Sequence, residues 1–332
     1  MTGTVPARLR DEVRERYGVG PRFAEAYLGY WAAARGRRYE SLAEILDAPL
    51  PEPMWFDFAM SANWRGERFA EALRPHLPAG ARRYLDVGCG FGGSLVAFAR
   101  LGLDVVGIEP APERVELTRA NLADEGIGDR VHEVGILAPD LVERLGVFDL
   151  VTCIDVIEHV DDVPATIGRL VELLRPGGLL ALEIPNAECP AFVARDGHFG
   201  LFGITLLDRE DARLYQRANL DGPYDVGEYH PLPYYERRFA ALGCSSELLD
   251  PAASRPEAAP RLASLLAGYV RSRPSRAALP PALRARLARR LASYLAGLAL
   301  RRAAATVSAA RRQAFARRYG PEFWTLLVRR AS

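Results

Sequence analysis

The stretch of residues 84–109 constrains the fold of this chain more than any other. It opens with an apolar run that carries Asp86 near its end, followed by a turn with four glycines between positions 88 and 93. Residues 94–101 then have the apolar spacing of a helix, and residues 103–108 form a second apolar run. Strand, glycine turn, helix and strand make one βαβ unit, and such units build a parallel sheet with helices on its faces.

The glycine turn and the acidic residues near the two strand ends predict a bound nucleotide-like cofactor. Gly88, Gly90 and Gly92 let the backbone turn tightly and approach a ligand at a distance that a Cβ atom would block. Glu109, at the end of the second strand, can accept two hydrogen bonds from a ribose diol. Asp86 is unfavourable beside a pyrophosphate and suits an ammonium group, which argues against a dinucleotide.

The pattern Asp-x-Gly-x-Gly-x-Gly resembles motif I of the class I S-adenosylmethionine-dependent methyltransferases. Three later segments agree with that family in order: residues 148–155 with its fourth strand, 174–178 with the turn before its fifth strand, and 179–186 with the fifth strand. The resemblance runs from about residue 65 to residue 250 and resumes at Phe323. It implies a doubly wound α/β fold with a seven-stranded sheet and S-adenosylmethionine as the cofactor.

The resemblance also implies which residues hold the cofactor. Asp86 and the turn from Gly88 to Gly92 line its methionine end, and Glu109 holds the ribose. Arg65 reaches the carboxylate of the cofactor unless it makes an ordinary contact between helix and core. Many relatives place an acidic residue for the adenine after the third strand, whereas this chain has Ile136 and Leu137 there. Stacking and backbone groups would then hold the adenine, or Asp140 would. The full expected set is Arg65, Asp86, Gly88, Cys89, Gly90, Gly92, Glu109, Ile136, Leu137 and Ile154.

Length and composition predict a globular chain with a full hydrophobic core. The 332 residues are 49% hydrophobic, enough for one large or two small domains. The chain has no apolar run of membrane-spanning length and no apolar leader near Met1, so we expect a cytoplasmic protein. Its four cysteines are scattered without a C-x-x-C pair, which predicts reduced thiols and no zinc site.

Charge and turn signals divide the chain into four expected parts. Residues 1–80 read as an N-terminal helical cap and 81–250 as the methyltransferase core, with an irregular active-site lid at 187–232. Residues 251–320 read as a basic helical insertion between strands six and seven, and 321–332 as the last core strand. Residues 251–332 hold 17 arginines and two acidic residues, whereas residues 1–250 hold 26 arginines and 40 acidic residues. The insertion would serve as a substrate lid, a dimer-forming element or a solvated basic surface.

Candidate catalytic residues follow the fourth strand. Asp155, Glu158 and His159 stand at i, i+3 and i+4, so on a helical turn they would project on one side. In the ubiquinone-biosynthesis O-methyltransferases and the small-RNA 2′-O-methyltransferases, a similar Glu-x-x-Glu-His motif binds Mg²⁺. Here that motif, with His198 of the lid, predicts either an Mg²⁺ site (Asp155, Glu158, His159, His198), a structural or cofactor-binding cluster, or a metal-free base. The expected catalytic residues are His159, His198 and Asp155.

These observations predict methyl transfer from S-adenosylmethionine to a small metabolite, on oxygen in preference to nitrogen or carbon. The metabolite would be free, phosphorylated or bound to a carrier. Two other functions stay open at this point. The arginine-rich insertion would track phosphates in a nucleic-acid methyltransferase, although it lacks the interleaved aromatics of a single-strand binder. Alternatively, the chain would be a cofactor-binding module that recruits an acidic carrier protein through its basic helices.

Overall fold

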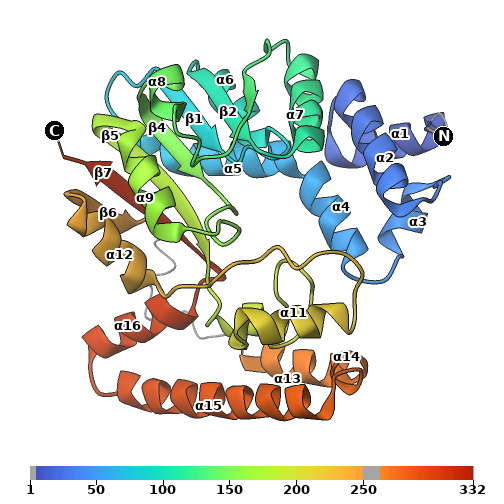
Figure 1. Ribbon diagram of the computed structural model, residues 1–332, viewed down its shortest axis with the longest axis vertical. Coiled ribbons are helices and arrows are strands. Elements are labelled where there is room, and N and C mark those ends of the chain that lie inside the picture. The colour runs from blue at the N-terminus through green and yellow to red at the C-terminus, as the bar shows by residue number, and fades with distance from the viewer. Residues whose placement is uncertain (1–4, 250–261, 332) are drawn as a thin grey trace. The chain divides into compact units, whose positions relative to one another are not determined.

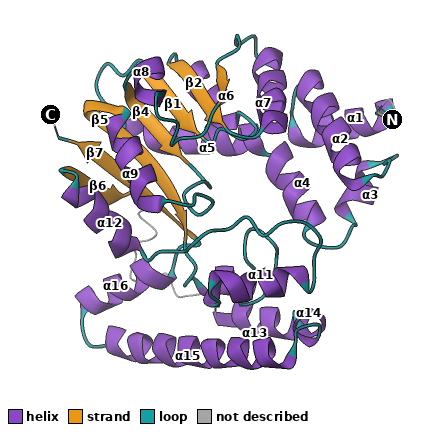
Figure 2. Cartoon of the chain, in the orientation of Figure 1, coloured by secondary structure: helices purple, strands orange, loops and turns teal. Residues whose placement is uncertain are grey.

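A computed structural model of the chain describes residues 5–249 and 262–331. Its strands form one seven-stranded sheet in the order β3-β2-β1-β4-β5-β7-β6 (Figures 1 and 2). The strands are β1 (Arg83–Val87), β2 (Asp104–Glu109), β3 (Val131–Glu133), β4 (Phe148–Cys153), β5 (Leu174–Pro185), β6 (Cys244–Leu248) and β7 (Phe323–Arg330). Strand β1 pairs in parallel with β2 and β4, and β2 pairs in parallel with β3. This is the seven-stranded α/β sheet that the sequence resemblance predicts.

The last strand runs against its neighbour β5. At one end, the Asn186 amide just after β5 donates to the carbonyl of Glu322 just before β7. At the other end, the guanidinium of Arg330 reaches the carbonyl of Leu174, the first residue of β5. The start of β7 therefore lies beside the end of β5, and the sheet is mixed.

The chain divides into two compact units, each described here by itself. The first comprises residues 1–154, 165–181 and 329–332, and the second comprises residues 155–164 and 182–328. Helices of the first unit are α1 (Ala7–Tyr17), α2 (Pro21–Arg35), α3 (Leu42–Leu46), α4 (Glu52–Met60), α5 (Ala62–Leu73), α6 (Gly93–Arg100), α7 (Pro112–Asp124), α8 (Leu141–Leu145) and most of α9 (Val163–Glu172), with a 3₁₀ turn η1 (Arg74–His76). None of the helices in the described residues is long and apolar enough to cross a membrane.

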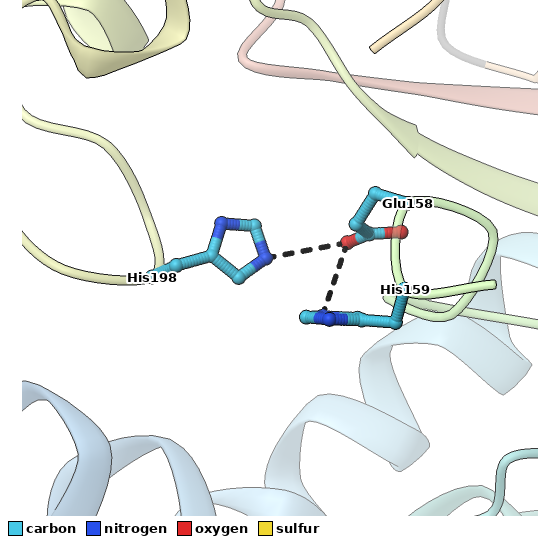
Figure 3. Close-up of side chains that lie close together, drawn as sticks. All are labelled: Glu158, His159 and His198. Atoms are coloured by element: carbon cyan, nitrogen blue, oxygen red, sulfur yellow. Dashed lines mark ion pairs between the residues drawn. The ribbon is translucent and has the colours of Figure 1, made fainter. Parts of the chain in front are cut away.

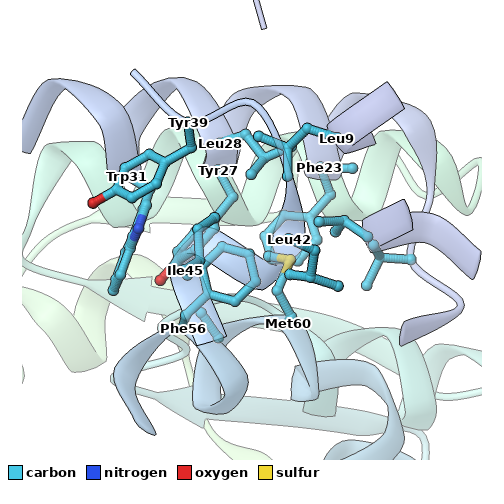
Figure 4. Packing of buried hydrophobic residues seen from close by; sticks show 14 of the residues in the cluster. Leu9, Phe23, Tyr27, Leu28, Trp31, Tyr39, Leu42, Ile45, Phe56 and Met60 are labelled. Atoms are coloured by element: carbon cyan, nitrogen blue, oxygen red, sulfur yellow. The ribbon is translucent and has the colours of Figure 1, made fainter. Parts of the chain in front are cut away.

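The N-terminal helices share a core with the methyltransferase fold inside the first unit. Aromatic and aliphatic side chains of α1–α4 pack around Tyr27, Trp31 and Phe56, which are almost fully buried (Figure 4). Leu117 of α7 belongs to the same cluster, and Phe91 of the glycine turn packs against it. Residues 1–80, expected as a separate cap, thus fall within the same compact unit as β1 to β4.

Helix α2 depends on α7 for its N-terminal cap. Its first turn has no capping side chain of its own, because the residue before it is Gly20. The carboxylate of Asp124 instead accepts hydrogen bonds from the backbone N–H groups of Arg22 (3.1 Å) and Phe23 (2.9 Å). A Cβ atom on Gly20 would lie 2.3 Å from that carboxylate, so only glycine leaves room for it. This contact fixes the N-terminal helices onto the fold.

The second unit contains the remaining helices. They are α10 (Pro190–Ala194), α11 (Arg209–Arg217), α12 (Leu232–Ala241), α13 (Leu262–Arg271), α14 (Arg273–Ala277), α15 (Pro281–Ala305) and α16 (Ala309–Tyr319), with a 3₁₀ turn η2 (Ile204–Leu206). Helices α13 to α16 stand between β6 and β7 in the chain. The expected helical segment 251–319 is described only from Leu262 onward, since residues 250–261 lie outside the described part.

Three local expectations were wrong. Residues 187–232 are irregular only in part, because α10, η2 and α11 lie within that segment. Strand β4 ends at Cys153 and not at Asp155, where the backbone turns with a φ of 53°. Strand β5 begins at Leu174, because Gly177, with a φ of 73°, lets the strand continue through a Pro-Gly-Gly sequence that reads as a turn.

Candidate active site

The glycine turn lies between β1 and α6 in the first unit. Gly88, Gly90 and Gly92 have φ angles of 69°, 55° and 79°, a region that other residues rarely adopt. The backbone N–H groups of Gly88 and Cys89 both donate to the carbonyl of Ile108 at the end of β2. The turn therefore needs glycine for its conformation, as expected.

Helix α7 holds the turn through two buried polar side chains that the sequence analysis did not single out. Thr118 donates to the carbonyl of Gly90 (2.6 Å), and Asn121 donates to the carbonyl of Phe91 (2.7 Å). Asn121 also exchanges two amide hydrogen bonds with Asn63 of α5. These residues were missed because their only local signal is polarity on the inner face of a helix.

Helix α5 touches the same turn with its backbone. A Cβ atom on Gly66 would lie 2.3 Å from the carbonyl oxygen of Gly93, and a Cβ atom on Gly93 would lie 2.0 Å from that of Ala62. Side chains at these two glycines would push the helices apart. The first residue of α6 is thus in direct contact with α5.

Asp86 is the buried acid of the site, with 4% of its surface exposed. The Thr152 hydroxyl donates to its carboxylate (2.7 Å), so the Tyr84 hydroxyl, 2.6 Å from the Thr152 oxygen, donates to Thr152. Burial raises the pKa of Asp86 to about 7; these hydrogen bonds oppose the shift, and the charge of Glu109 adds to it. A cation beside this buried carboxylate would stabilise its ionised form. The ammonium and sulfonium groups of S-adenosylmethionine are suitable cations.

Glu109 connects the two strand ends. Its carboxylate accepts from the backbone N–H groups of Gly90 (3.1 Å) and Ala111 (3.1 Å), and 3% of its surface is exposed. Each carboxylate oxygen has a second lone pair, so these contacts leave capacity for a ribose diol. Glu109 thus orients the glycine turn, and its role at the ribose stays a prediction.

The other expected cofactor residues have mixed surroundings. Cys89 and Ile136 are buried and Ile154 is half-buried, whereas Leu137 is exposed. Arg65 donates to the carbonyl of Phe58 (3.1 Å), and its guanidinium carbon lies 3.6 Å from the centre of the Phe58 ring. This is the helix contact that the sequence analysis weighed against a contact with the cofactor. Asp140 is exposed and 3.6 Å from Arg144.

A cluster of titratable side chains, which could bind a metal or accept a proton, lies in the second unit. One carboxylate oxygen of Glu158 is 3.5 Å from Nε2 of His198 and 3.9 Å from Nε2 of His159 (Figure 3). Glu158 and His159 share one turn, and His198 reaches the same oxygen from a separate loop. The Glu158 side chain is 2% exposed. Neither of its oxygens has a hydrogen-bond partner that meets normal geometry among the described residues.

Asp155, the fourth member of the expected set, is not part of this group. The described structure brings together ligand atoms of Glu158, His159 and His198 only. The i, i+3, i+4 alignment requires a helical turn, whereas residues 155–160 form an irregular turn that Asp155 enters with a positive φ. The expectation that Asp155 shares a metal site with the other three was therefore wrong.

Backbone contacts fix the two histidines. Asp196 is buried and accepts from the N–H groups of His198 (2.9 Å), Phe199 (2.9 Å) and Leu201 (2.7 Å), which shapes the loop that carries His198. Nδ1 of His159 lies 3.0 Å from the carbonyl oxygen of Asp225. The loop after α11 thus supports the turn that carries Glu158 and His159, and the Gly227 amide also donates to the Glu158 carbonyl.

His198 stands between Glu158 and Tyr229. The hydroxyl of Tyr229 is 3.2 Å from Nδ1, on the opposite side of the ring from Glu158. Burial alone would lower the pKa of His198, but Glu158, with Asp196 and Asp155, raises it overall. Tyr229 is a further functional candidate that the sequence did not indicate, because no motif marks it. His230 instead stacks on Tyr234, with ring centres 3.9 Å apart.

The cluster can be tested as a metal site by its donor atoms. Ligand atoms of the three side chains lie within 4.8 Å of one another, close enough for one ion. Two imidazoles and one carboxylate suit a first-row transition ion, whereas Mg²⁺ prefers a shell of oxygen ligands. The donor set therefore does not favour Mg²⁺, which was one of the three interpretations of this motif.

Comparison with known proteins agrees with this geometry. Residues 37–248 match the model of a family described as a methyltransferase domain. The "Ubiquinone biosynthesis O-methyltransferase" of Xanthomonas axonopodis pv. citri is 44% identical over 117 residues, which are 35% of this chain and 47% of that protein. The protein with the same description in Xanthomonas euvesicatoria pv. vesicatoria is 40% identical over 124 residues, 37% of this chain and 51% of its own. The chain thus spans about half the length of these curated relatives.

Among solved structures, the SAM-bound amino pentose methyltransferase CalS10 of Micromonospora echinaspora aligns with a TM-score of 0.41 and 23% identity. The alignment covers 60% of this chain and 91% of that one. The family match itself spans more than half of the sequence. The chain belongs to this methyltransferase-domain family, and it is a class I S-adenosylmethionine-dependent methyltransferase.

Proposed function

We propose that this enzyme methylates a hydroxyl oxygen of a small biosynthetic metabolite and that His198 accepts the hydroxyl proton. The observation that carries the proposal is the buried Glu158 carboxylate beside the imidazole of His198, 3.5 Å from Nε2. The relatives described as ubiquinone-biosynthesis O-methyltransferases support an oxygen acceptor. The chain itself links this cluster to the cofactor fold, because β4 ends at Cys153, in register with Val87, and Glu158 follows five residues later.

The two sides of the His198 ring have different tasks. Nε2 faces the carboxylate, so its hydrogen points toward Glu158 and leaves Nδ1 as the nitrogen that can accept a proton. The Tyr229 hydroxyl lies at that nitrogen and can pass on a proton from the acceptor. The Glu158 carboxylate then stabilises the imidazolium that forms.

The cofactor supplies an electrophilic methyl carbon bound to a positively charged sulfur. As the C–S bond breaks and the C–O bond forms, the acceptor oxygen must lose its proton to avoid a positive charge. The protein contributes alignment of the two reactants and a base for that proton. The products are the methyl ether, S-adenosylhomocysteine and a proton on His198.

Single substitutions test the assignment of the base. We expect His198→Gln to lower kcat by about 10²-fold to 10⁴-fold, as for loss of a general base, with little change in cofactor affinity. Because Glu158 raises the pKa of His198, Glu158→Gln should shift the acid limb of the pH–rate profile to lower pH. His230→Gln is the matched control, since His230 stacks on Tyr234. The assay uses a hydroxyl acceptor that the wild type methylates. An unchanged kcat of His198→Gln with that acceptor would contradict the proposal.

A metal-assisted reaction is the second candidate, favoured by the convergence of Glu158, His159 and His198. Those residues would hold the ion, and a bound cation would lower the pKa of the acceptor hydroxyl. Metal analysis of the purified enzyme and assays after chelation separate the two candidates. Activity that survives chelation supports the metal-free base, whereas loss with recovery on adding Mn²⁺, Zn²⁺ or Mg²⁺ supports the ion and identifies it.

A further inference from the structure

The helices between β6 and β7 have an unusual charge composition. Residues 262–319 contain 13 arginines and not one aspartate or glutamate. Three of the arginines pair with acids outside the segment: Arg286 with Asp211, Arg317 with Glu236, and Arg318 with Glu188. These ion pairs fix α15 and α16 onto the rest of the second unit. Among the described residues, the other ten arginines of the segment form no ion pair.

Two pairs of adjacent arginines lie on α15, the long helix between α14 and α16 in Figure 1. Arg289 and Arg290 form one exposed pair, and Arg301 and Arg302 form another. None of the four makes an ion pair with any residue in the described part of the chain. The first residues of the two pairs are twelve positions apart, about 18 Å along a helix axis.

Between the two pairs, α15 presents an uncharged face to solvent. Residues 291–300 contain no charged side chain. Leu298 faces inward into a buried cluster, with Leu291 and Tyr294 packed against it. The outward face carries Leu295 (44% exposed) and Leu300 (72% exposed), and its other exposed members are the small residues Ala292, Ser293, Ala296 and Ala299.

We propose that this face of α15, from Arg289 to Arg302, docks an amphipathic helix of an acidic protein partner. Small side chains let a second helix approach closely, and the two exposed leucines supply apolar contact. At 3.6 residues per turn, Arg289 lies on this face and Arg302 at its edge, whereas Arg290 and Arg301 project on the side of Tyr294. Arg289 and Arg302 would meet carboxylates near the two ends of the partner helix, and such charge complementarity favours fast and selective association.

The same features disfavour other occupants. Two copies of α15 packed together, parallel or antiparallel, would bring one arginine pair against another. Insertion into a membrane surface needs more large apolar side chains than Leu295 and Leu300. Single-stranded nucleic acid needs aromatic side chains for stacking, and α15 exposes none between its arginine pairs.

Binding of a defined probe to the full-length enzyme tests the proposal without any turnover, so the result is independent of the proposed methyl transfer. The probe is a fluorescent amphipathic helix of about 20 residues, with two glutamate pairs spaced like Arg289 and Arg301 and an alanine–leucine face between them. Its control carries glutamine in place of every glutamate. Fluorescence anisotropy at low and at physiological salt gives the affinities.

We expect the glutamate probe to bind more tightly than the glutamine probe, and more weakly as salt is added. The double variant Arg289→Glu with Arg302→Glu should weaken binding at least about tenfold. Ala296→Trp, which changes no charge but blocks close approach, should do the same. Arg312→Glu, an equally exposed site on α16, is the matched control and should keep nearly all of the affinity.

Circular dichroism of each variant establishes that it is folded. Equal affinity of the two probes, or wild-type affinity in both the double variant and Ala296→Trp, would overturn the proposal. Phosphatidylserine vesicles and duplex RNA serve as competing ligands. If either binds the enzyme and Ala296→Trp equally well while the glutamate probe does not bind, the surface recognises that polyanion and the proposed helix is wrong.

Discussion

Cofactor affinity should depend on pH through Asp86. In the free enzyme, burial raises the pKa of this carboxyl from 3.8 to about 7. A bound ammonium or sulfonium favours the charged form and lowers that pKa, so binding releases a proton wherever Asp86 was protonated. Affinity should therefore fall as the pH drops below about 7, by about tenfold per pH unit, or about 1.4 kcal/mol. On the alkaline side the α-amino group of the ligand loses its charge, at a pH above the value of about 7.7–8.0 for a polypeptide N-terminus because the ligand's own carboxylate is ionised. The profile should be bell-shaped.

Isothermal titration calorimetry with S-adenosylhomocysteine between pH 5 and pH 9 would measure this profile. On the acid limb, the affinity should change about tenfold per pH unit. Asp86→Asn should remove the acid limb and keep the alkaline one. Because the Glu109 charge helps to raise the pKa of Asp86, Glu109→Gln should move the acid midpoint to lower pH. Methylthioadenosine has no ammonium group and should show a much weaker dependence on pH.

The outcome can refute the reasoning in two ways. A flat affinity between pH 5 and pH 7 for S-adenosylhomocysteine would mean that Asp86 is ionised throughout or distant from the ligand charge. An acid limb that survives in Asp86→Asn would assign the titration to another group. In both cases the role carried over to Asp86 from the family would be wrong.

Three further substitutions test the packing around the glycine turn and the N-terminal helices. Asn121→Leu leaves the carbonyl of Phe91 without its donor, so we expect about 1–3 kcal/mol less stability and weaker cofactor binding; normal values of both would contradict the role of this side chain. Asp124→Ala removes the cap of α2 and should cost about 1 kcal/mol in urea unfolding, compared with almost nothing for the exposed control Asp11→Ala. Phe56→Ala opens a cavity in the N-terminal cluster and should lower the free energy of unfolding by about 3–5 kcal/mol. A loss below about 1 kcal/mol, as for a surface site, would place Phe56 outside the core.

The sequence predicted the parts of this protein whose signals are local. Asp86, the glycines and Glu109 all belong to one βαβ unit, so their spacing along the chain reveals both the strand ends and the turn between them. His198 could be predicted as a candidate because the chain has only five histidines and this one follows the fifth strand. In these cases a short stretch of sequence contains the physical reason for the structure.

The remaining features depend on contacts between distant segments. Thr118 and Asn121 bind the glycine turn from a helix about 30 residues later, and nothing in their own helix indicates it. Asp155 was misplaced because i, i+3 and i+4 spacing has meaning only on a helix, and the backbone there turns with a positive φ. The path of β5 through Gly177 likewise depends on pairing in the sheet, which overrides the turn preference of Pro-Gly-Gly.

The backbone contact between α5 and α6 limits how this enzyme can be recombined with its relatives. Because Gly66 lies against Gly93, a donor sequence with any larger residue at either position would force α5 away from the glycine turn. A chimera that exchanges the N-terminal helices should therefore have its junction before Ala62, so that α5 stays with the fold that it supports. The helices before that point also contact the fold, through Phe91 of the glycine turn and through the Asp124 cap, so a donor sequence must keep both contacts.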